Sequence, residues 1–443
     1  MRAVTCGQRV EKAMRPTVLA IAWMALAAAS GVRAGGREWA RFRGPNGTGI
    51  SDATTVPVTW TAKDYNWTVT LPGVGHSSPV LWGGRLFVTS GEKATAKRLV
   101  LCLDAATGKT LWRREFPSKT HRQHRDNSYG SITPAADADG LVLAWGTPEQ
   151  VLLLALDLDG REIWRRDLGP YVGDHGAGTS PIIAGGLVVL ANDQEDPKAI
   201  PSMYGPNTTR PPGKSFLIAV DRKTGETRWT VSRRTRLSAY STPCVSRSLE
   251  GRPELIFTST AHGITGVDLA TGMVTWELNG VFRDRCVGSP ALGAGLVMAS
   301  YGAGTQGARL VAVRPGSRPK GIEPKLVWEL KRPVPLVPTP LVKDGLAFLW
   351  GDDGRVSCVR AATGEVVWRQ RVKGSFYGSP VWVAGRLYSI SKRGEVVVLA
   401  AAERFQQLAR VPLGEPSFAT PAVAGGVMYL RTRSHLFSLG GGS

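Results

Sequence analysis

Short apolar runs that alternate with tight polar turns recur along most of this chain. Residues 99–112 show the pattern clearly, because Leu99, Leu101 and Leu103 alternate there with other apolar residues. Such a period of two is typical of a strand buried on both faces. A polar turn follows, and a second strand then begins and reaches Trp112. The same strand, turn and strand recur at residues 155–164, 219–229, 266–276 and 359–368, which indicates a repeat architecture.

The turns share a residue pattern with a physical purpose. An aspartate opens most of these turns, where its carboxylate can accept hydrogen bonds from the backbone amides ahead of it. A glycine near the end of the turn can adopt a positive φ. The predicted turn residues are Asp104, Gly108, Asp157, Asp221, Gly225, Asp268, Gly272 and Gly364. Later units lose the aspartate, and residues 314–325 replace one short turn with a proline-rich loop.

Two further markers allow the units to be counted. A tryptophan follows most turns, and the docking tryptophans predicted in this way are Trp67, Trp112, Trp164, Trp229, Trp276, Trp328 and Trp368. A Ser-Pro or Thr-Pro dipeptide opens each of eight units, beginning at Ser78, Thr133, Ser180, Thr242, Ser289, Thr339, Ser379 and Thr420. A proline near the start of a strand is tolerated because its missing amide lies outside the main ladder.

The two ends of the repeat array complement each other. Residues 66–71 form a tryptophan strand without a preceding partner, whereas the last unit stops after residues 435–439 without such a strand. We therefore predict that residues 66–71 supply the outer strand of the last blade and close the ring. The predicted fold class is all-β: an eight-bladed β-propeller of four-stranded antiparallel blades with tryptophan-docking repeats.

The repeat Ala-x-Asp-x-x-x-Gly-x-x-x-Trp resembles the tryptophan-docking repeat of the pyrroloquinoline-quinone (PQQ)-like β-propellers. This family includes PQQ-dependent alcohol dehydrogenases and BamB-like propellers of outer-membrane protein assembly. The segment Trp39-Ala40-Arg41-Phe42-Arg43-Gly44-Pro45-Asn46-Gly47 resembles the opening of many exported PQQ-like repeat proteins. The resemblance implies the fold strongly, and the function only weakly, because one fold carries many functions.

The chain before the repeats reads as two segments. Residues 1–34 resemble a secretory signal peptide, with a basic start, an apolar core and small residues at a cleavage site; an uncleaved anchor is the alternative. Residues 35–63 are predicted to be an extension whose aromatic side chains pack on the propeller flank, with a partner-binding arm as the alternative. The propeller is expected over residues 64–443. These features predict an exported protein that is periplasmic, associated with the outer membrane, or secreted.

Composition narrows the functional classes. The 443 residues carry a formal net charge of +20, but no dense basic run and no nucleic-acid-binding motif, so we expect no nucleic-acid partner. None of the five cysteines forms a Cys-x-x-Cys pair, which argues against metal-finger and redox motifs. Cys102 and Cys358 are expected to act as buried apolar residues, and a disulfide between Cys244 and Cys286 is left open.

Contact residues are expected in two long polar connections, residues 118–128 and 192–214, and in the segments that lead into the inner strands. The candidate rim contacts are His121, His124, Asn127, Tyr129, His175 and Tyr240. No catalytic, cofactor-binding or metal-binding residue is assigned. PQQ with calcium would require a cluster of acidic oxygen ligands; the inner connections offer only Asp174 and Asp284, and the chain lacks adjacent cysteines.

The function predicted from these observations is an exported, non-catalytic scaffold that binds a protein partner in the cell envelope. The resemblance to BamB implies a role in outer-membrane protein assembly, with peripheral membrane association. Two alternatives remain at this point: a PQQ-dependent oxidoreductase, and a secreted binder of anionic polymers or glycans. The oligomeric state is left open.

Overall fold

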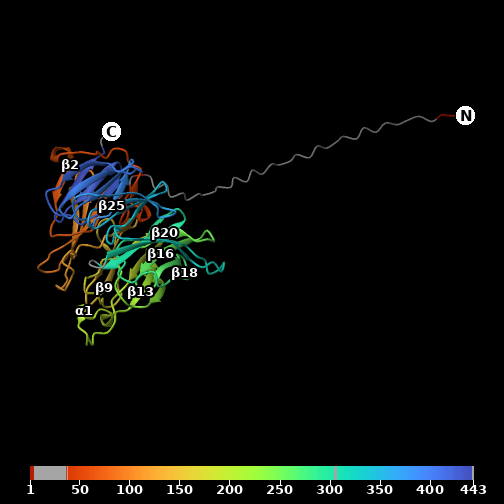
Figure 1. Cartoon of the computed structure of the whole chain (residues 1–443). Coiled ribbons are helices and arrows are strands. Elements are labelled where there is room, and N and C mark those ends of the chain that lie inside the picture. The colour runs from red at the N-terminus through yellow and green to blue at the C-terminus, as the bar shows by residue number, and fades with distance from the viewer. Residues whose placement is uncertain (4–35, 37, 304–306, 442–443) are drawn as a thin grey trace. The chain divides into compact units, whose positions relative to one another are not determined.

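Eight β-sheets follow one another along the chain as the blades of a propeller (Figure 1). This computed structural model describes residues 1–3, 36, 38–303 and 307–441. The predicted all-β, eight-bladed fold is confirmed. Most of the predicted signal peptide lies outside the described residues. The described part of the chain has no helix long and apolar enough to cross a membrane. Its helical segments are η1 (Pro45–Gly47), η2 (Ala62–Asp64), η3 (Pro197–Ala199) and α1 (Pro201–Tyr204).

Each blade runs from an inner strand near the axis to an outer strand at the rim. Blade 1 contains β3 (Val80–Trp82), β4 (Arg85–Gly91), β5 (Arg98–Asp104) and β6 (Thr110–Phe116). Blade 2 contains β7 (Ala135–Asp137), β8 (Gly140–Gly146), β9 (Val151–Leu156) and β10 (Glu162–Asp167). Blade 3 contains β11 (Ile182–Ala184), β12 (Leu187–Asn192), β13 (Ser215–Asp221) and β14 (Thr227–Arg233). Blade 4 contains β15 (Cys244–Arg247), β16 (Pro253–Ser259), β17 (Gly263–Asp268) and β18 (Val274–Leu278).

The remaining blades repeat this order. Blade 5 contains β19 (Ala291–Gly293), β20 (Leu296–Ala303), β21 (Gly307–Arg314) and β22 (Lys325–Lys331). Blade 6 contains β23 (Leu341–Lys343), β24 (Leu346–Trp350), β25 (Arg355–Arg360) and β26 (Val366–Arg371). Blade 7 contains β27 (Val381–Val383), β28 (Arg386–Ile390), β29 (Glu395–Ala400) and β30 (Gln407–Pro412). Blade 8 contains β31 (Ala422–Ala424), β32 (Val427–Arg431), β33 (His435–Gly440) and β2 (Tyr65–Thr70).

The middle strands are apolar on both sides because each blade packs between two others. In β5, Leu99 and Leu101 contribute to the cluster shared with blades 7 and 8, whereas Val100 and Cys102 pack against blade 2. Cys102 is fully buried, as the sequence suggested, and Cys244 and Cys286 are both free thiols. The alternating apolar pattern is thus the signature of a sheet with a neighbouring sheet on each face.

The ring closes with the strand that the sequence predicted. Strand β2 pairs antiparallel with β33, with Trp67 opposite Ser438 and Thr70 opposite His435. Figure 1 shows β2, near the N-terminal end of the colour scale, beside the blue C-terminal blade. One blade departs from the predicted four strands, because β1 (Ile50–Ser51) adds a fifth, parallel strand to the inner edge of blade 7.

The docking tryptophans contact the turn of the next blade in sequence. The indole Nε1 of Trp164 donates to the carbonyl of Arg222 at 3.0 Å, and that of Trp229 to the carbonyl of Leu269 at 3.0 Å. The turn aspartates accept backbone amides, as Asp104 does from Thr107 at 2.8 Å. The same kind of indole bond is made by Trp67, Trp112, Trp328 and Trp368.

Burial of these indoles is less uniform than their repetition suggests. Trp164, Trp229, Trp276 and Trp328 are buried, but Trp67, Trp112 and Trp368 are only half-buried. Trp276 is an exception in its bonding, since its Nε1 donates to Glu254 of its own blade at 3.0 Å. The short turn that would receive it is replaced by the loop after β21, as the sequence indicated.

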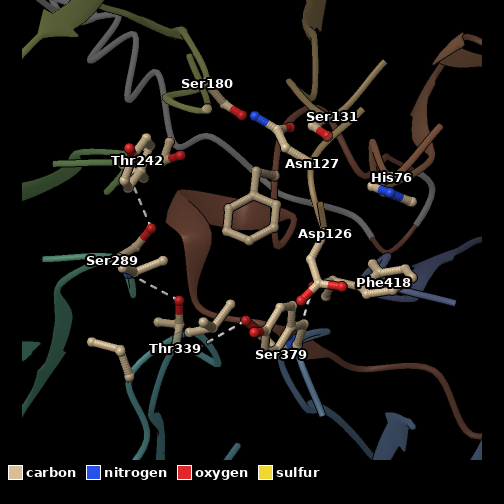
Figure 2. Close-up of a pocket in the computed structure, with 18 of the residues that line it drawn as sticks. His76, Asp126, Asn127, Ser131, Ser180, Thr242, Ser289, Thr339, Ser379 and Phe418 are labelled. Atoms are coloured by element: carbon tan, nitrogen blue, oxygen red, sulfur yellow. Dashed lines mark hydrogen bonds between the residues drawn. The ribbon is translucent and has the colours of Figure 1, made fainter. Parts of the chain in front are cut away.

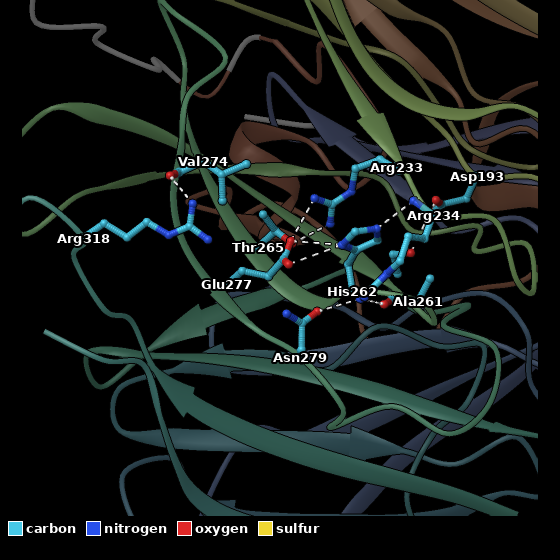
Figure 3. A network of polar contacts seen from close by, with 11 residues as sticks. Asp193, Arg233, Arg234, Ala261, His262, Thr265, Val274, Glu277, Asn279 and Arg318 are labelled. Carbon is cyan, nitrogen blue, oxygen red and sulfur yellow. Dashed lines mark hydrogen bonds and ion pairs between the residues drawn. The ribbon is translucent and has the colours of Figure 1, made fainter. Parts of the chain in front are cut away.

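A buried ion pair adds a polar joint between blades 3 and 4 (Figure 3). Arg233, at the end of β14, donates to Glu277 of β18 at 2.8 Å and to the hydroxyl of Thr265 at 2.7 Å. His262 lies 3.2 Å from the same carboxylate. Burial alone would raise the pKa of Glu277, but His262 and Arg233 lower it to about 2. The carboxylate therefore stays charged and joins the two blades.

Two glycine substitutions should separate backbone strain from loss of docking. Gly186 and Gly225 have φ values of 76° and 72°, but a Cβ at Gly225 would lie 2.7 Å from the Trp164 ring, whereas one at Gly186 meets nothing within 4 Å. Gly186→Ala should lower the free energy of unfolding by about 1–2 kcal/mol through its backbone alone. Gly225→Ala should cost about 1–3 kcal/mol more, because the indole must move. If urea unfolding showed equal losses of free energy of unfolding for Gly186→Ala and Gly225→Ala, the docking role of Gly225 would be contradicted.

Candidate functional site

The N-terminal extension crosses the central channel of the propeller. Trp39 forms a bridge with Leu81 of blade 1, and the carbonyl of Ala40 accepts the amide of Ala136 of blade 2 at 2.8 Å. Asn46 exchanges two hydrogen bonds with the backbone of Val245 of blade 4, at 2.7 and 2.8 Å. Residues 39–46 therefore do not pack on the flank as expected, whereas Val56 and Trp60 of the same extension do pack against blades 7 and 8. The backbone of residues 39–46 forms hydrogen bonds with the short inner strands. The local sequence pattern of the segment could not predict these distant partners.

Two arginines of the extension are buried among backbone carbonyls. Arg43 is 0% exposed and donates to the carbonyls of Pro380 and Pro340 at 3.1 and 3.3 Å, and Arg41 donates to that of Pro243 at 2.5 Å. In the described part of the chain neither guanidinium forms an ion pair. Burial lowers the pKa of Arg41 to about 10 and that of Arg43 to about 9. Both remain positively charged at neutral pH.

The side chain between these arginines, Phe42, lines a cavity of about 410 Å³ on the propeller axis. Its wall is formed by the connections into the inner strands and by the Ser or Thr residue of each of the eight Ser-Pro and Thr-Pro dipeptides. The volume lies within the range of small-ligand sites. The extension blocks the channel behind Phe42, so the cavity opens at the other end, which we call the mouth.

The eight hydroxyl side chains are linked into what we call the hydroxyl belt. The amide of one member donates to the hydroxyl of the next blade, as Thr242 does to Ser289 at 3.0 Å and Ser289 to Thr339 at 3.0 Å (Figure 2). Among the described residues seven such bonds are formed, and the last, from Thr420 to Ser78, joins blade 8 to blade 1 at 3.2 Å. The others run from Ser78, Thr133, Thr339 and Ser379.

On one side of the mouth, an aromatic cluster surrounds a lysine that is paired with an aspartate. The Lys392 ammonium lies 4.1 Å from the Tyr377 ring centroid and 5.3 Å from that of Phe418, and bonds to Asp126 at 3.0 Å. The His76 ring stacks on Phe418 at 4.5 Å. Burial, and then the charges of Arg431 and Arg433, lower the pKa of His76 to about 3, so its imidazole is neutral.

The opposite side is organised around a fully buried carboxylate. Glu195 accepts hydrogen bonds from Arg285 at 2.7 Å, Tyr204 at 2.6 Å and Ser238 at 2.9 Å. The hydroxyl of Ser238 also lies 2.8 Å from that of Tyr240. Burial alone would raise the pKa of Glu195, but the bonds from Arg285 and Tyr204 lower it. The insertion at residues 192–214 is thus anchored at its base.

The structure brings together most of the candidate rim contacts. His124, Asn127, His175 and Tyr240 line the axial cavity. His121 lines a separate cavity of about 160 Å³ with Tyr204 and Arg210. Tyr129 is buried instead, and its hydroxyl bonds to the backbone of His121.

Sequence reasoning missed Phe42, Asp126, Arg285 and the hydroxyl belt. The belt is visible in the sequence as eight Ser-Pro or Thr-Pro dipeptides at equivalent positions of the repeats. Their role in joining blades could not be predicted, because it depends on which blades are neighbours. Arg285 and Asp126 carry no repeat signal, since each lies in a connection unique to its blade.

The cavity does not present the oxygen-rich donor set that calcium with PQQ would need. Calcium takes six to eight oxygen ligands, whereas Asp126 is the one carboxylate among the described lining residues and it is bonded to Lys392. Within the described residues no three His, Cys, Asp or Glu side chains converge as a metal site. The described residues therefore do not form the acidic calcium site that this cofactor would need.

An eight-bladed propeller with tryptophan-docked blades and a blind axial cavity defines this protein as a PQQ-like repeat propeller. A family model described as outer membrane protein assembly factor BamB matches residues 57–193, 99–318 and 352–439, more than half of the chain. The chain therefore belongs to the BamB family.

Individual similarities are more distant. The chain is 22% identical over 292 residues to outer membrane protein assembly factor BamB of Moranella endobia, covering 63% of this chain and 57% of the relative. It is 21% identical over 336 residues to BamB of Yersinia pestis, covering 74% of this chain and 65% of the relative. The chain thus spans less than two thirds of the length of these curated relatives.

Solved structures agree on the fold alone. BamB from Moraxella catarrhalis superposes with a TM-score of 0.57 at 14% identity, covering 84% of this chain and 95% of that one. A europium-containing methanol dehydrogenase gives a TM-score of 0.51 at 14% identity, covering 82% and 89%. Likeness of fold therefore does not separate a scaffold from an enzyme.

A buried carboxylate beside the cavity should make stability depend on pH. Asp352 accepts the amides of Leu336 and Val337 at 2.7 and 3.2 Å, and burial raises its pKa to about 6. Between pH 4 and 6 the folded state holds this proton more tightly than the unfolded state, so its contribution to stability falls as pH rises. Asp352→Asn should therefore be more stable than the parent protein by about 1–3 kcal/mol at pH 7.5, with less gain at pH 4.5. If urea unfolding showed the same gain in free energy of unfolding for Asp352→Asn at both pH values, the raised pKa of Asp352 would be contradicted.

Proposed function

We propose that this protein is an exported, non-catalytic scaffold that binds a protein partner of the cell envelope at the mouth of its axial cavity. Membership of the BamB family supports outer-membrane protein assembly as the process, since the relatives are named for that role. A periplasmic or outer-membrane-associated location, with peripheral membrane association, follows from the same proposal. It requires no quinone cofactor.

The observation that carries the proposal is that the carboxylates around the cavity already form hydrogen bonds or ion pairs within the protein. Asp126 is bonded to Lys392, Glu195 to Arg285, and Asp352 to backbone amides. A general base must be able to reach and accept a substrate proton, and these groups are already engaged within the protein. Such an arrangement favours binding over proton-transfer chemistry.

The mouth offers features that a protein partner can use. The insertion between β12 and β13 projects exposed residues beside it, including Arg210, whose guanidinium lies 5.5 Å from the Tyr204 ring centroid. Aromatic and arginine side chains are enriched in the energetic centres of interfaces. The turn after β13 lies at the other end of that strand, so Lys223 marks the opposite face of the same blade.

A pair of charge reversals tests which face binds. Arg210→Glu should weaken the crosslinked capture of an outer-membrane assembly protein by about tenfold, because it reverses an exposed charge on the insertion whose base, Glu195, bonds to the cavity residue Arg285. Lys223→Glu makes the same change at an exposed position on the opposite face and should leave capture unchanged. Both variants should keep the parent melting temperature, since surface substitutions change stability little.

Partners are identified by mass after crosslinking in native cells. Equal effects of the two variants would refute binding at the mouth. A large rise in melting temperature with PQQ and calcium would refute the non-catalytic proposal, because a ligand at 100 times its dissociation constant adds about 2.7 kcal/mol of stability.

A further inference from the structure

The central channel already accommodates an extended polypeptide. Residues 38–51 of this chain cross it, and their backbone and side chains bond to inner strands of several blades. A second chain that entered from the mouth would meet Phe42, which lines the cavity from the blocked side. Such a chain would have to end there, so the cavity favours a chain terminus over a continuous segment.

The cavity wall is rich in hydrogen-bond donors. Within the described part of the chain, seven of the eight belt hydroxyls accept a backbone amide, and none of the eight donates its own proton to a protein acceptor. The Nε of Arg285, a donor, also lacks a partner among the described residues, and so do the Nδ1 atoms of His76 and His175, each of which is a donor in one tautomer of the neutral ring. Unpaired buried polar atoms are costly, and a ligand with acceptor atoms can satisfy them.

Several buried or partly buried cations lie around the cavity. Arg431 is 0% exposed and bonds to Ser77, the residue before the belt member Ser78, at 2.9 Å. The cations near the cavity include Arg41, Arg43, Arg285, Lys392 and Arg431, and the carboxylates include Asp126, Asp174, Glu195 and Asp352, of which Asp126, Asp174 and Glu195 are paired with cations. Burial, and after it neighbouring cations, lower the pKa values of His76 and His175. A terminal carboxylate suits this environment, and a terminal ammonium does not.

We propose that the axial cavity binds the C-terminal carboxylate of a partner polypeptide. The carboxylate accepts hydrogen bonds from belt hydroxyls near the floor, and the last side chain lies against the apolar and aromatic wall that includes Val287, Leu336 and Tyr377. Charge-assisted bonds of this kind are stronger than bonds between neutral groups. This inference rests on the proposed function, because it specifies how the partner is recognised.

The test compares two fluorescent pentapeptides, Gly-Ser-Gly-Ala-Leu, one with a free C-terminal carboxylate and one amidated, against the full chain. The acid should bind, and the amide should bind about tenfold more weakly, because it carries no charge. Thr242→Val should weaken binding of the acid severalfold without lowering the melting temperature, since the hydroxyl of Thr242 accepts no belt bond among the described residues. Thr110→Val, an exposed position on β6, is the matched control and should bind normally.

Three results would overturn the inference: equal binding of the acid and the amide, no binding of either, or no effect of Thr242→Val. Benzoate is a small free acid without a peptide chain. If benzoate displaced the labelled acid peptide at the same concentration as the unlabelled acid peptide does, the inference would also be overturned, because a carboxylate alone would then be enough for binding. Partner capture that still depends on Arg210 while the acid peptide fails to bind would reject this inference alone. If the acid peptide failed to bind and partner capture did not depend on Arg210, the proposed function would be rejected as well.

Discussion

The hydroxyl belt is the interaction on which the architecture depends. Among the described residues, seven of the eight inner strands are preceded by a Ser or Thr whose buried amide, which water cannot satisfy, donates to a hydroxyl of the next blade. The bond from Thr420 to Ser78 joins the last blade to the first, at the same junction where β2 pairs with β33. The belt therefore fixes the spacing of neighbouring blades and lines the cavity that their inner strands enclose.

Polar chemistry is arranged differently on the two sides of the belt. Behind Phe42, backbone carbonyls hold the guanidinium groups of Arg41 and Arg43. Toward the mouth, hydroxyl protons and aromatic rings face the cavity, and its carboxylates are engaged within the protein. The extension thus gives a through-going channel a floor and places positive charge beneath it.

Local patterns in the sequence were enough to predict the blades and their closure. The period of two in residues such as Leu99 and Leu101 reports a sheet packed on both faces, and residues 66–71 were left without a partner that only the last blade could supply. The course of the extension could not be predicted, because Arg43 bonds to carbonyls about 300 residues away, a separation that leaves no local pattern. Likewise His124 and Tyr129 lie in one connection, but backbone turns direct only His124 into the cavity.

The most direct test of the belt compares two Thr→Val substitutions. Thr339 accepts the buried amide of Ser289, so Thr339→Val leaves that amide unsatisfied and should lower the free energy of unfolding by about 1–3 kcal/mol. Thr242→Val removes an equivalent hydroxyl that accepts no belt bond among the described residues, and should change stability by less than about 0.5 kcal/mol. Equal effects of the two substitutions in urea unfolding would contradict a structural role for the belt.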